Sequence, residues 1–282
     1  MVASSSECTI WFTVFTAEFV AIVTANLLSI ILFIKNRSLR TRSMYLVISL
    51  IVADMLAGGL SGSVSQLDLL RNCHFVNSYL VYLKVNIVLR NIWLFFPFVS
   101  LTNIAMISLE RVHATFRPIE HRIIRKWVYV VAIAVVWVLP VITSVTSMVV
   151  LLMTGYYLFF YGFHCCLCLF VICVSYIAIL IKFRCGAHPR RYFATSSKQR
   201  KLTVTLFITT LVSLLLWLPY HILVIVNLKT SGLPSSFPRL EAVRLGYSLF
   251  VLFYANSLVN PVLYTIRIPD FKRAFFSLFR RQ

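Results

Sequence analysis

The sequence predicts an all-α membrane protein, a seven-transmembrane helix bundle with a short amphipathic C-terminal helix. Three observations support this fold class. Hydrophobic residues make up 60% of the 282 residues and charged residues only 12%, whereas a soluble domain carries about 25% charged residues. The hydrophobic residues form long runs, and most of the 27 lysine and arginine residues lie between these runs. We therefore expect lipid to cover much of the surface of a single domain, residues 1–282.

Each transmembrane element is predicted from a run of about 20 mostly apolar residues, the length at which a helix crosses the hydrocarbon core. The runs do not alternate apolar and polar residues as barrel strands do, so helices are favoured. In chain order the predicted spans are Ile10–Ile34, Met44–Leu69, Tyr79–Leu109, Trp127–Met153, Tyr156–Phe183, Leu202–Leu228 and Ala242–Ile266.

The basic residues predict the orientation of these spans. Most of them follow the first, third, fifth and seventh spans, and loops rich in lysine and arginine stay in the cytoplasm. We therefore expect a multi-pass protein of the plasma membrane, with its N-terminus outside and its C-terminus inside. The net charge of +19 then faces anionic lipid and a cytoplasmic partner rather than nucleic acid. The sequence has no evident cleavable signal, so we expect the first span to serve as an uncleaved one.

The last predicted element covers about residues 269–280. Phe271, Phe275, Leu278 and Phe279 recur at helical spacing with basic residues between them. This pattern is typical of an amphipathic helix that lies on the inner leaflet. The alternative is an unstructured basic tail.

Ionisable side chains inside a membrane are costly and often mark functional sites. Asp54, in the second span, has no basic neighbour in the sequence, so it requires polar groups around it or a bound cation. One helical face of the third helix is marked by residues that recur at spacings of four and three. They are Asn86, Arg90, Trp93, Pro97, Ser100, Ile104, Ile107 and Arg111. We expect this face to point into the bundle, although Arg90 has the alternative of reaching the outer headgroups.

Prolines interrupt the last two spans. Pro219 follows Trp217, and Pro261 lies beside Asn256, Ser257 and Asn260. A proline inside a helix removes a backbone hydrogen bond and bends the helix. We expect the inner half of the sixth span to be able to swing, and the polar residues beside Pro261 to solvate Asp54. The alternative is that both prolines only shape the packing.

Of the seven cysteines, Cys8 and Cys73 are the candidates for a disulfide outside the membrane. The others lie in an apolar run or in a basic loop, where cysteine often behaves as a small hydrophobe. A bridge and two free thiols both remain open at this point.

Together these residues resemble the rhodopsin-like (class A) family of G-protein-coupled receptors. The motif Glu110-Arg111-Val112 resembles the family's Asp-Arg-Tyr, and Trp217-Leu218-Pro219 resembles its Cys-Trp-x-Pro. The landmarks occur in order along the chain. They are Asn26, Asp54, Glu110, Arg111, Pro118, Trp137, Tyr176, Trp217, Pro219, Asn260, Pro261 and Tyr264.

The resemblance implies a mechanism and a partner. A ligand alters the packing around Trp217, the inner end of the sixth helix swings outward, and a cleft opens for the α-subunit of a heterotrimeric G protein. The residues implied in switching and coupling are Glu110, Arg111, Pro118, Ile119, Tyr176, Pro219, Pro261 and Tyr264. The implied sodium pocket consists of Asp54, Ser100, Trp217, Asn256 and Asn260. Beyond this allosteric Na⁺, no cofactor is expected.

Three departures from the usual family pattern point to one branch of the family. The third helix has no cysteine for the usual disulfide, the second extracellular loop is very short, and Cys168 stands in place of the fifth-helix proline. These features resemble the branch of melanocortin, lysophospholipid, cannabinoid and adenosine receptors. Gln199 stands near where an acidic partner of Arg111 often lies, so we expect noticeable basal activity.

The predicted ligand site in the outer half is mainly aromatic, as small-ligand sites often are. Trp93 occupies the position at which monoamine receptors carry an aspartate, which disfavours a monoamine. We expect an amphiphilic or anionic lipid, or a peptide, with Arg90 holding a charged group. For His164 and His221 the alternative is a hydrogen-bonded core histidine. The predicted lining is Arg90, Trp93, Leu94, Phe160, Tyr161, His164, Tyr220, His221, Val224, Phe250 and Tyr254.

Two other function classes are disfavoured. A transporter or channel requires charged residues on several helices at mid-membrane, and we identified only Asp54 there. An intramembrane enzyme requires a catalytic or metal-binding motif, and the sequence has no such spacing of His, Asp and Glu and no Gly-x-Ser-x-Gly. We therefore expect a receptor rather than an enzyme.

Overall fold

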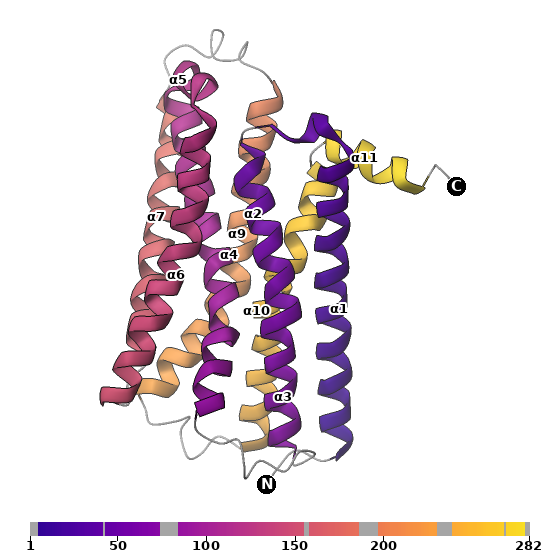
Figure 1. Ribbon diagram of the computed structural model, residues 1–282, viewed down its shortest axis with the longest axis vertical. Helices are drawn as coiled ribbons and strands as arrows, with labels where there is room; N and C mark the ends of the chain where they lie inside the picture. Colours follow the sequence, from indigo (N-terminus) through magenta and orange to yellow (C-terminus); the bar gives the residue numbers. More distant parts are fainter. Residues whose placement is uncertain are drawn as a thin grey trace.

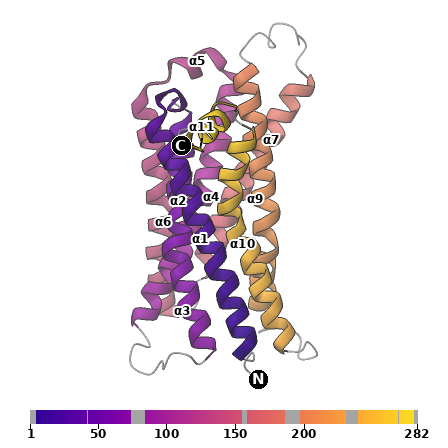
Figure 2. The same cartoon turned by 90° about the vertical axis from the view of Figure 1, so that its right-hand side faces the viewer.

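A computed structural model describes residues 5–41, 43–73, 84–154, 158–185, 197–229, 239–267 and 269–279. Every regular element in these ranges is helical, and seven helices are long and apolar enough to cross a membrane. Figures 1 and 2 show them side by side in one bundle. The predicted fold class is confirmed. The long elements are α1 (Ser5–Lys35), α2 (Met44–Leu56) continued by η2 (Ala57–Ser61) and α3 (Gly62–Asn72), α4 (Lys84–Phe116), α6 (Lys126–Thr154), α7 (Leu158–Cys185), α9 (Ser197–Lys229) and α10 (Arg239–Arg267).

Several helices extend beyond the apolar runs that predicted them. Helix α1 begins at Ser5 rather than Ile10, and α4 continues to Phe116 rather than ending at Leu109. Hydropathy marks only the part inside hydrocarbon, whereas backbone hydrogen bonding can continue through the headgroup region. Residues 79–83 and 156–157 of the predicted spans lie outside the described residues.

The second span is not one regular helix. Between α2 and α3, η2 is a π-helical turn that contains Gly58 and Gly59. A Cβ on Gly58 would lie 2.6 Å from Cγ2 of Ile22, and a Cβ on Gly62 would lie 2.7 Å from Cγ of Phe19. These glycines therefore permit the close approach of α1 to the irregular part of the span.

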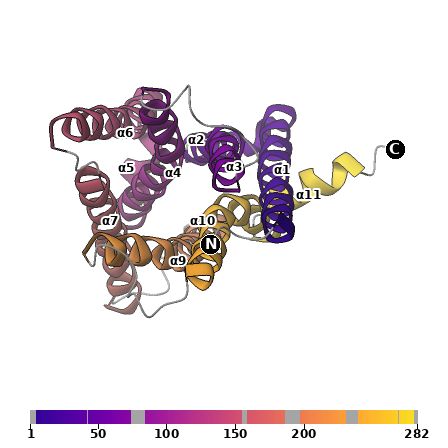
Figure 3. The same cartoon turned by 90° about the horizontal axis from the view of Figure 1, so that it is seen from below.

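Helix α4 packs against α2, α6, α7 and α9, while α10 packs against α9, α1 and α2. Seen along the bundle in Figure 3, α1 lies at one edge and α6 and α7 at the other. On α6 many large apolar side chains face outward, among them Trp127, Val130 and Val138. This exposure is expected of a helix whose outer face contacts lipid.

Three features connect or extend the helices at the ends of the bundle. The disulfide Cys8–Cys73 ties the start of α1 to the end of α3, so of the two alternatives that the sequence left open the bridge is the one that forms. Between α4 and α6 lies a short helix that was not predicted, α5 (Pro118–Ile123), with proline at its favoured first position. At the opposite end of the bundle from the start of α1, the 3-10 turn η1 (Arg37–Leu39) adjoins α11 (Pro269–Phe279).

Helix α11 confirms the predicted amphipathic helix. Phe271 is 1% exposed, whereas Lys272 and Arg273 are exposed to solvent. The apolar face is held by rings of the bundle, because Phe271 lies against Phe33 of α1 and Tyr264 of α10. The alternative of an unstructured tail is therefore wrong for residues 269–279.

Candidate functional site

The centre of the bundle is organised around the carboxylate of Asp54, which is fully buried on α2. Its Oδ1 accepts hydrogen bonds from Ser100 Oγ at 2.7 Å and from Ser257 Oγ at 2.9 Å. Its Oδ2 accepts one from Asn260 Nδ2 at 2.7 Å. A buried charge is tolerated when it is fully hydrogen-bonded. One carboxylate thus connects α2, α4 and α10.

The partners of Asp54 differ in part from the predicted sodium pocket. Ser100 and Asn260 bond to it as expected, but Ser257 bonds to it where the resemblance had implied Asn256 and Trp217. Asn256 Oδ1, Asn260 Oδ1 and Trp217 Nε1 are buried with no hydrogen-bond partner among the described residues. Unpaired buried polar atoms usually mark places for water or an ion. The expectation that polar residues beside Pro261 solvate Asp54 is confirmed.

An aromatic cluster is formed by rings of α4, α9 and α10. Trp217 stacks on His221 with ring centroids 5.1 Å apart, and lies 4.9 Å from Phe253 and 6.0 Å from Phe98. Trp93 stacks on Phe250 at 6.0 Å. The sequence analysis missed Phe98 and Phe253, although Phe253 follows Phe250 at helical spacing.

Other predicted pocket residues join this cluster or its neighbours. Tyr220 and Tyr254 both lie against Phe250, at 5.9 Å and 4.8 Å between ring centroids. Leu94 is buried, and Phe160 is partly buried. The side chains of Arg90 and Val224 lie outside the described part of the chain, so their predicted roles stay predictions.

His164 and Tyr161 connect helices rather than pointing unpaired polar atoms at a pocket. His164 is 4% exposed, and its two ring nitrogens lie 2.9 Å from Thr102 Oγ1 on α4 and 2.8 Å from Thr143 Oγ1 on α6. The Tyr161 hydroxyl donates to Asn91 Oδ1 at 3.0 Å. This geometry favours the alternative of a hydrogen-bonded core histidine for His164. His221 is also hydrogen-bonded, since its Nδ1 lies 3.0 Å from the backbone oxygen of Trp217, and its ring in addition stacks within the aromatic cluster.

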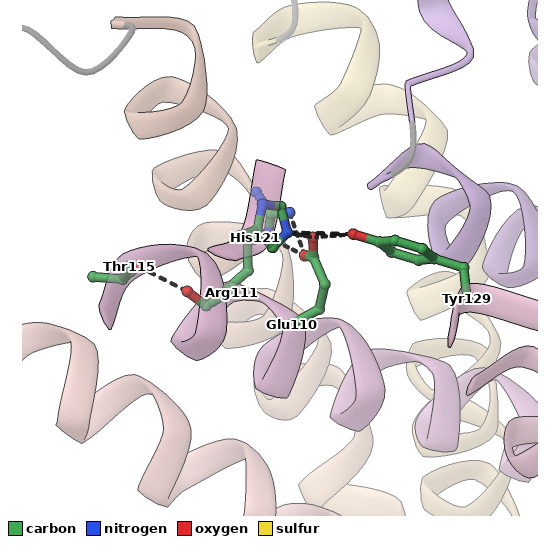
Figure 4. A network of polar contacts seen from close by, with 5 residues as sticks. All are labelled: Glu110, Arg111, Thr115, His121 and Tyr129. Atoms are coloured by element: carbon green, nitrogen blue, oxygen red, sulfur yellow. Dashed lines mark hydrogen bonds and ion pairs between the residues drawn. The ribbon is translucent and has the colours of Figure 1, made fainter. Parts of the chain in front are cut away.

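The C-terminal end of α4 carries a network of charged and polar groups, drawn in Figure 4. Arg111 is 1% exposed and forms an ion pair with Oε2 of Glu110. The other oxygen of Glu110, Oε1, accepts a hydrogen bond from His121 Nε2 of α5 at 2.6 Å. The hydroxyl of Tyr129 on α6 lies 3.4 Å from the same oxygen and 3.3 Å from His121 Nε2. Glu110 therefore holds Arg111 with one oxygen and the loop helix with the other.

The sequence analysis predicted Glu110 and Arg111 but missed His121 and Tyr129. His121 is only 5% exposed although it lies in a connection. The available signal was a histidine three residues after Pro118, which places it on the first turn of α5. On the same short helix Ile119 is 79% exposed, so the predicted coupling residue does face outward.

Four further predicted switch residues lie on α7, α9 and α10. The hydroxyl groups of Tyr176 on α7 and Thr210 on α9 are 2.9 Å apart. Tyr264 is fully buried, and its hydroxyl has no hydrogen-bond partner among the described residues. Pro219 and Pro261 both lie inside unbroken helices, α9 and α10. Tyr176 therefore joins α7 to α9 both through its hydroxyl and through its ring, which lies 5.0 Å from that of Phe207.

The structure corrects one expectation. Asp54 is not alone inside the membrane, because Glu18 of α1 lies in the first span, and the sequence analysis overlooked it. Both carboxyl oxygens of Glu18 are buried and have no hydrogen-bond partner among the described residues. Near the start of the same helix, Glu7 forms an ion pair with Arg244 of α10.

The fold and these linked sites define a seven-helix membrane receptor with a buried polar centre. The family described as 7 transmembrane receptor (rhodopsin family) matches residues 25–264. The chain belongs to this family, which indicates a receptor rather than an enzyme.

Individual relatives are more distant. Somatostatin receptor type 1 of Rattus norvegicus is 28% identical over 37% of this chain and 25% of its own length. Neuropeptides B/W receptor type 2 of Homo sapiens is 34% identical over 39% of this chain and 32% of its length. Mas-related G-protein coupled receptor member A7 of Mus musculus is 28% identical over 68% of this chain and 65% of its length. The matched regions thus cover less than two thirds of each relative, and the predicted branch stays a prediction.

Proposed function

We propose that this chain binds an extracellular ligand in its outer half and activates a heterotrimeric G protein at its inner end. The N-terminus lies outside the cell and the C-terminus in the cytosol, at the plasma membrane. The observation that carries the proposal is the position of Asp54. Its hydrogen bonds join α2, α4 and α10 between the aromatic cluster around Trp217 and the Glu110–Arg111 pair. A two-state receptor needs such a connection between its two sites.

In the proposed change, the inner half of α9 swings outward about Pro219. The bond between Tyr176 and Thr210 joins α9 to α7 on this inner half, so it breaks or shifts during the movement. Arg111 leaves Glu110 and turns toward the G protein. Ligand and G protein both favour this state, and each therefore strengthens the binding of the other.

We propose that the ligand is an amphiphilic or anionic lipid, or a peptide. The aromatic cluster offers apolar area, and Arg90 supplies the charge that holds an acidic group. A peptide ligand is supported by the relatives, since one of them is named as a neuropeptide receptor. Trp93 stacks on Phe250 and leaves no carboxylate at the position where an amine would be held. If Arg90→Ala leaves ligand potency unchanged, the proposed charged contact is wrong.

We also propose that Na⁺ binds beside Asp54 and stabilises the inactive state. A carboxylate and the hydroxyls of Ser100 and Ser257 are oxygen ligands, the type that hard cations prefer. Asn256 and Asn260 each hold an unpaired amide oxygen in the same region of α10. No step of the signalling mechanism requires the ion, which acts only on the balance between the two states.

The deciding experiment is nucleotide exchange. The purified chain is placed in lipid nanodiscs with a heterotrimeric G protein, and GTP uptake is compared with that of Arg111→Ala. Faster exchange with the native chain than with the variant supports the proposal. Substrate uptake into liposomes without any exchange would instead favour a transporter. Epitope tags on both chain ends in intact cells test the orientation, and two tags on the same side would exclude it.

A further inference from the structure

Two basic segments from distant parts of the chain lie side by side at the inner end of the bundle. One runs from the end of α1 into η1, and the other is α11, which contacts both. Phe271 joins them, with its ring centroid 5.6 Å from that of Phe33 and 6.4 Å from that of Tyr264. Figures 1 and 2 show α11 leaving the bundle beside the end of α1. This packing gathers five cations, which we call the basic corner: Lys35, Arg37, Arg40, Lys272 and Arg273.

The positive charge of the basic corner is largely uncompensated. All five side chains are exposed. Asp270 pairs with Arg273 at 2.6 Å, yet the Arg273 side chain remains 79% exposed. Among the residues that the structure describes, Lys35, Arg37 and Lys272 form no ion pair. Arg40 donates to the backbone oxygen of Ile34 at 3.1 Å, which holds its guanidinium at the end of α1.

The depth of the basic corner follows from the apolar side chains around it. Ile34 at the end of α1 is 64% exposed, Ile266 at the end of α10 is 65% exposed, and Phe276 on α11 is 51% exposed. In a spanning protein such side chains contact acyl chains, and basic residues just beyond them lie at the headgroups. The basic corner therefore faces lipid phosphates rather than bulk cytosol.

We propose that the basic corner is a binding site for a polyphosphorylated inositol lipid of the inner leaflet. Clusters of lysine and arginine beside a membrane span attract such headgroups, and the planar arginine fork matches phosphate oxygens. A headgroup with one net charge satisfies one cation, whereas several phosphates satisfy the cations of both segments together. Because Phe271 also contacts Tyr264, the bound lipid holds α11 against the helix that carries Pro261. This inference is independent of coupling to a G protein.

The test measures lipid binding to the purified full chain in phosphatidylcholine nanodiscs that contain labelled phosphatidylinositol bisphosphate. The variant Arg37→Gln/Arg40→Gln/Lys272→Gln/Arg273→Gln is expected to lose at least about tenfold in affinity, because it removes four of the five positive charges that attract the lipid phosphates. The double variant Arg37→Gln/Lys272→Gln spares the two arginines that make contacts within the chain, and is expected to show an intermediate loss. Thermal unfolding confirms that both variants fold.

The matched control removes the same number of cations from the other inner corner, as Arg117→Gln/Arg122→Gln/Arg125→Gln/Lys126→Gln. It is expected to bind the lipid like the native chain. An equal loss in this control would overturn the proposal, because it would show general attraction rather than a site. Equal binding of phosphatidylserine would overturn it as well. Binding of free inositol trisphosphate as strong as that of the lipid would assign the site to a soluble ligand instead.

Discussion

The middle and the inner end of the bundle each bury one carboxylate, but the two are satisfied in different ways. Asp54 accepts hydrogen bonds from three neutral groups on two other helices. Glu110 is paired with Arg111, and its second oxygen bonds to His121. Neutral donors can be exchanged for an ion or water at little cost, whereas separating a buried ion pair leaves a charge without a partner. We infer that Asp54 tunes the balance between states, and that Glu110 sets the barrier against activation.

The largest effect is expected from Glu110→Gln. The change keeps the size of the side chain but leaves Arg111, which is 1% exposed, without its counter-ion. Breaking a buried pair in this way costs about 3–5 kcal/mol, and only the inactive arrangement bears this cost. We expect basal nucleotide exchange to rise by at least about tenfold, which corresponds to 1.4 kcal/mol.

Glu120→Gln is the matched control for this change. Glu120 lies on α5 and pairs with Arg117 at 3.1 Å, but both side chains are more than half exposed. Exposed pairs contribute about 0–1 kcal/mol, so basal exchange should stay at the native level. If Glu110→Gln and Glu120→Gln behave alike, the difference between a buried and an exposed pair does not govern activation.

The next effect is expected from Asp54→Asn, measured as the thermal stability of the purified chain in sodium and in potassium. The variant should fold, because Asn260 can turn its unpaired Oδ1 toward the new amide group. The native chain should gain about 2.7 kcal/mol at a sodium concentration one hundred times the dissociation constant, and the variant should gain nothing. A sodium response that survives in Asp54→Asn would place the ion elsewhere.

The sequence predicts the surroundings of Asp54 better than those of Glu110, because different features of the chain fix the positions of their partners. Ser100 and Asn260 lie on long helices, where regular spacing fixes the face and depth of a side chain. His121 lies in a connection, and no periodicity indicates that the chain turns back to bury it against Glu110. The π-helical turn at Gly58 was missed for a similar reason. At this turn Gly58 packs closely against Ile22 of α1. A contact between two helices cannot be predicted from the residues of the second span alone.

Other features were predictable because few alternatives existed. Cys8 and Cys73 were the two cysteines outside the apolar run and the basic loop, and they form the bridge. Trp93, Tyr220 and Phe250 of the aromatic cluster were predicted as pocket residues, whereas Phe98 and Phe253 were not. Glu18 lies in the first span but was not predicted as a site residue, because the family landmark of α1 is Asn26.

Glu18 differs from Asp54 and Glu110 because its carboxyl group has no hydrogen-bond partner among the described residues. Replacing it by leucine removes two buried oxygens that have no hydrogen bond among the described residues, and an unsatisfied buried group costs about 1–3 kcal/mol. We expect Glu18→Leu to raise the midpoint of thermal unfolding by a few degrees, which corresponds to about 1 kcal/mol. Glu18→Gln keeps the polar atoms and should gain less. A lower midpoint for Glu18→Leu would mean that the carboxyl has a stabilising partner.

A smaller effect on activation is expected from His121→Phe. The change keeps an aromatic ring at this position but removes the hydrogen bond to Glu110 Oε1. A buried hydrogen bond to a charged group contributes about 1.5–3 kcal/mol. Loss of this bond weakens the pair between Glu110 and Arg111 only in part. We therefore expect basal exchange to rise about threefold, well below the rise in Glu110→Gln. Tyr129→Phe removes the longer contacts, at 3.3 and 3.4 Å, and should change exchange less still.

The combined variant Glu110→Gln/His121→Phe decides whether His121 acts through Glu110. Two residues that act through one contact have effects that do not add. We therefore expect the pair to match Glu110→Gln alone in basal exchange, because the glutamine no longer fixes α5 against Arg111. A further threefold rise in the double variant would mean that His121 restrains the loop helix by another route, and that the two oxygens of Glu110 do not form one lock.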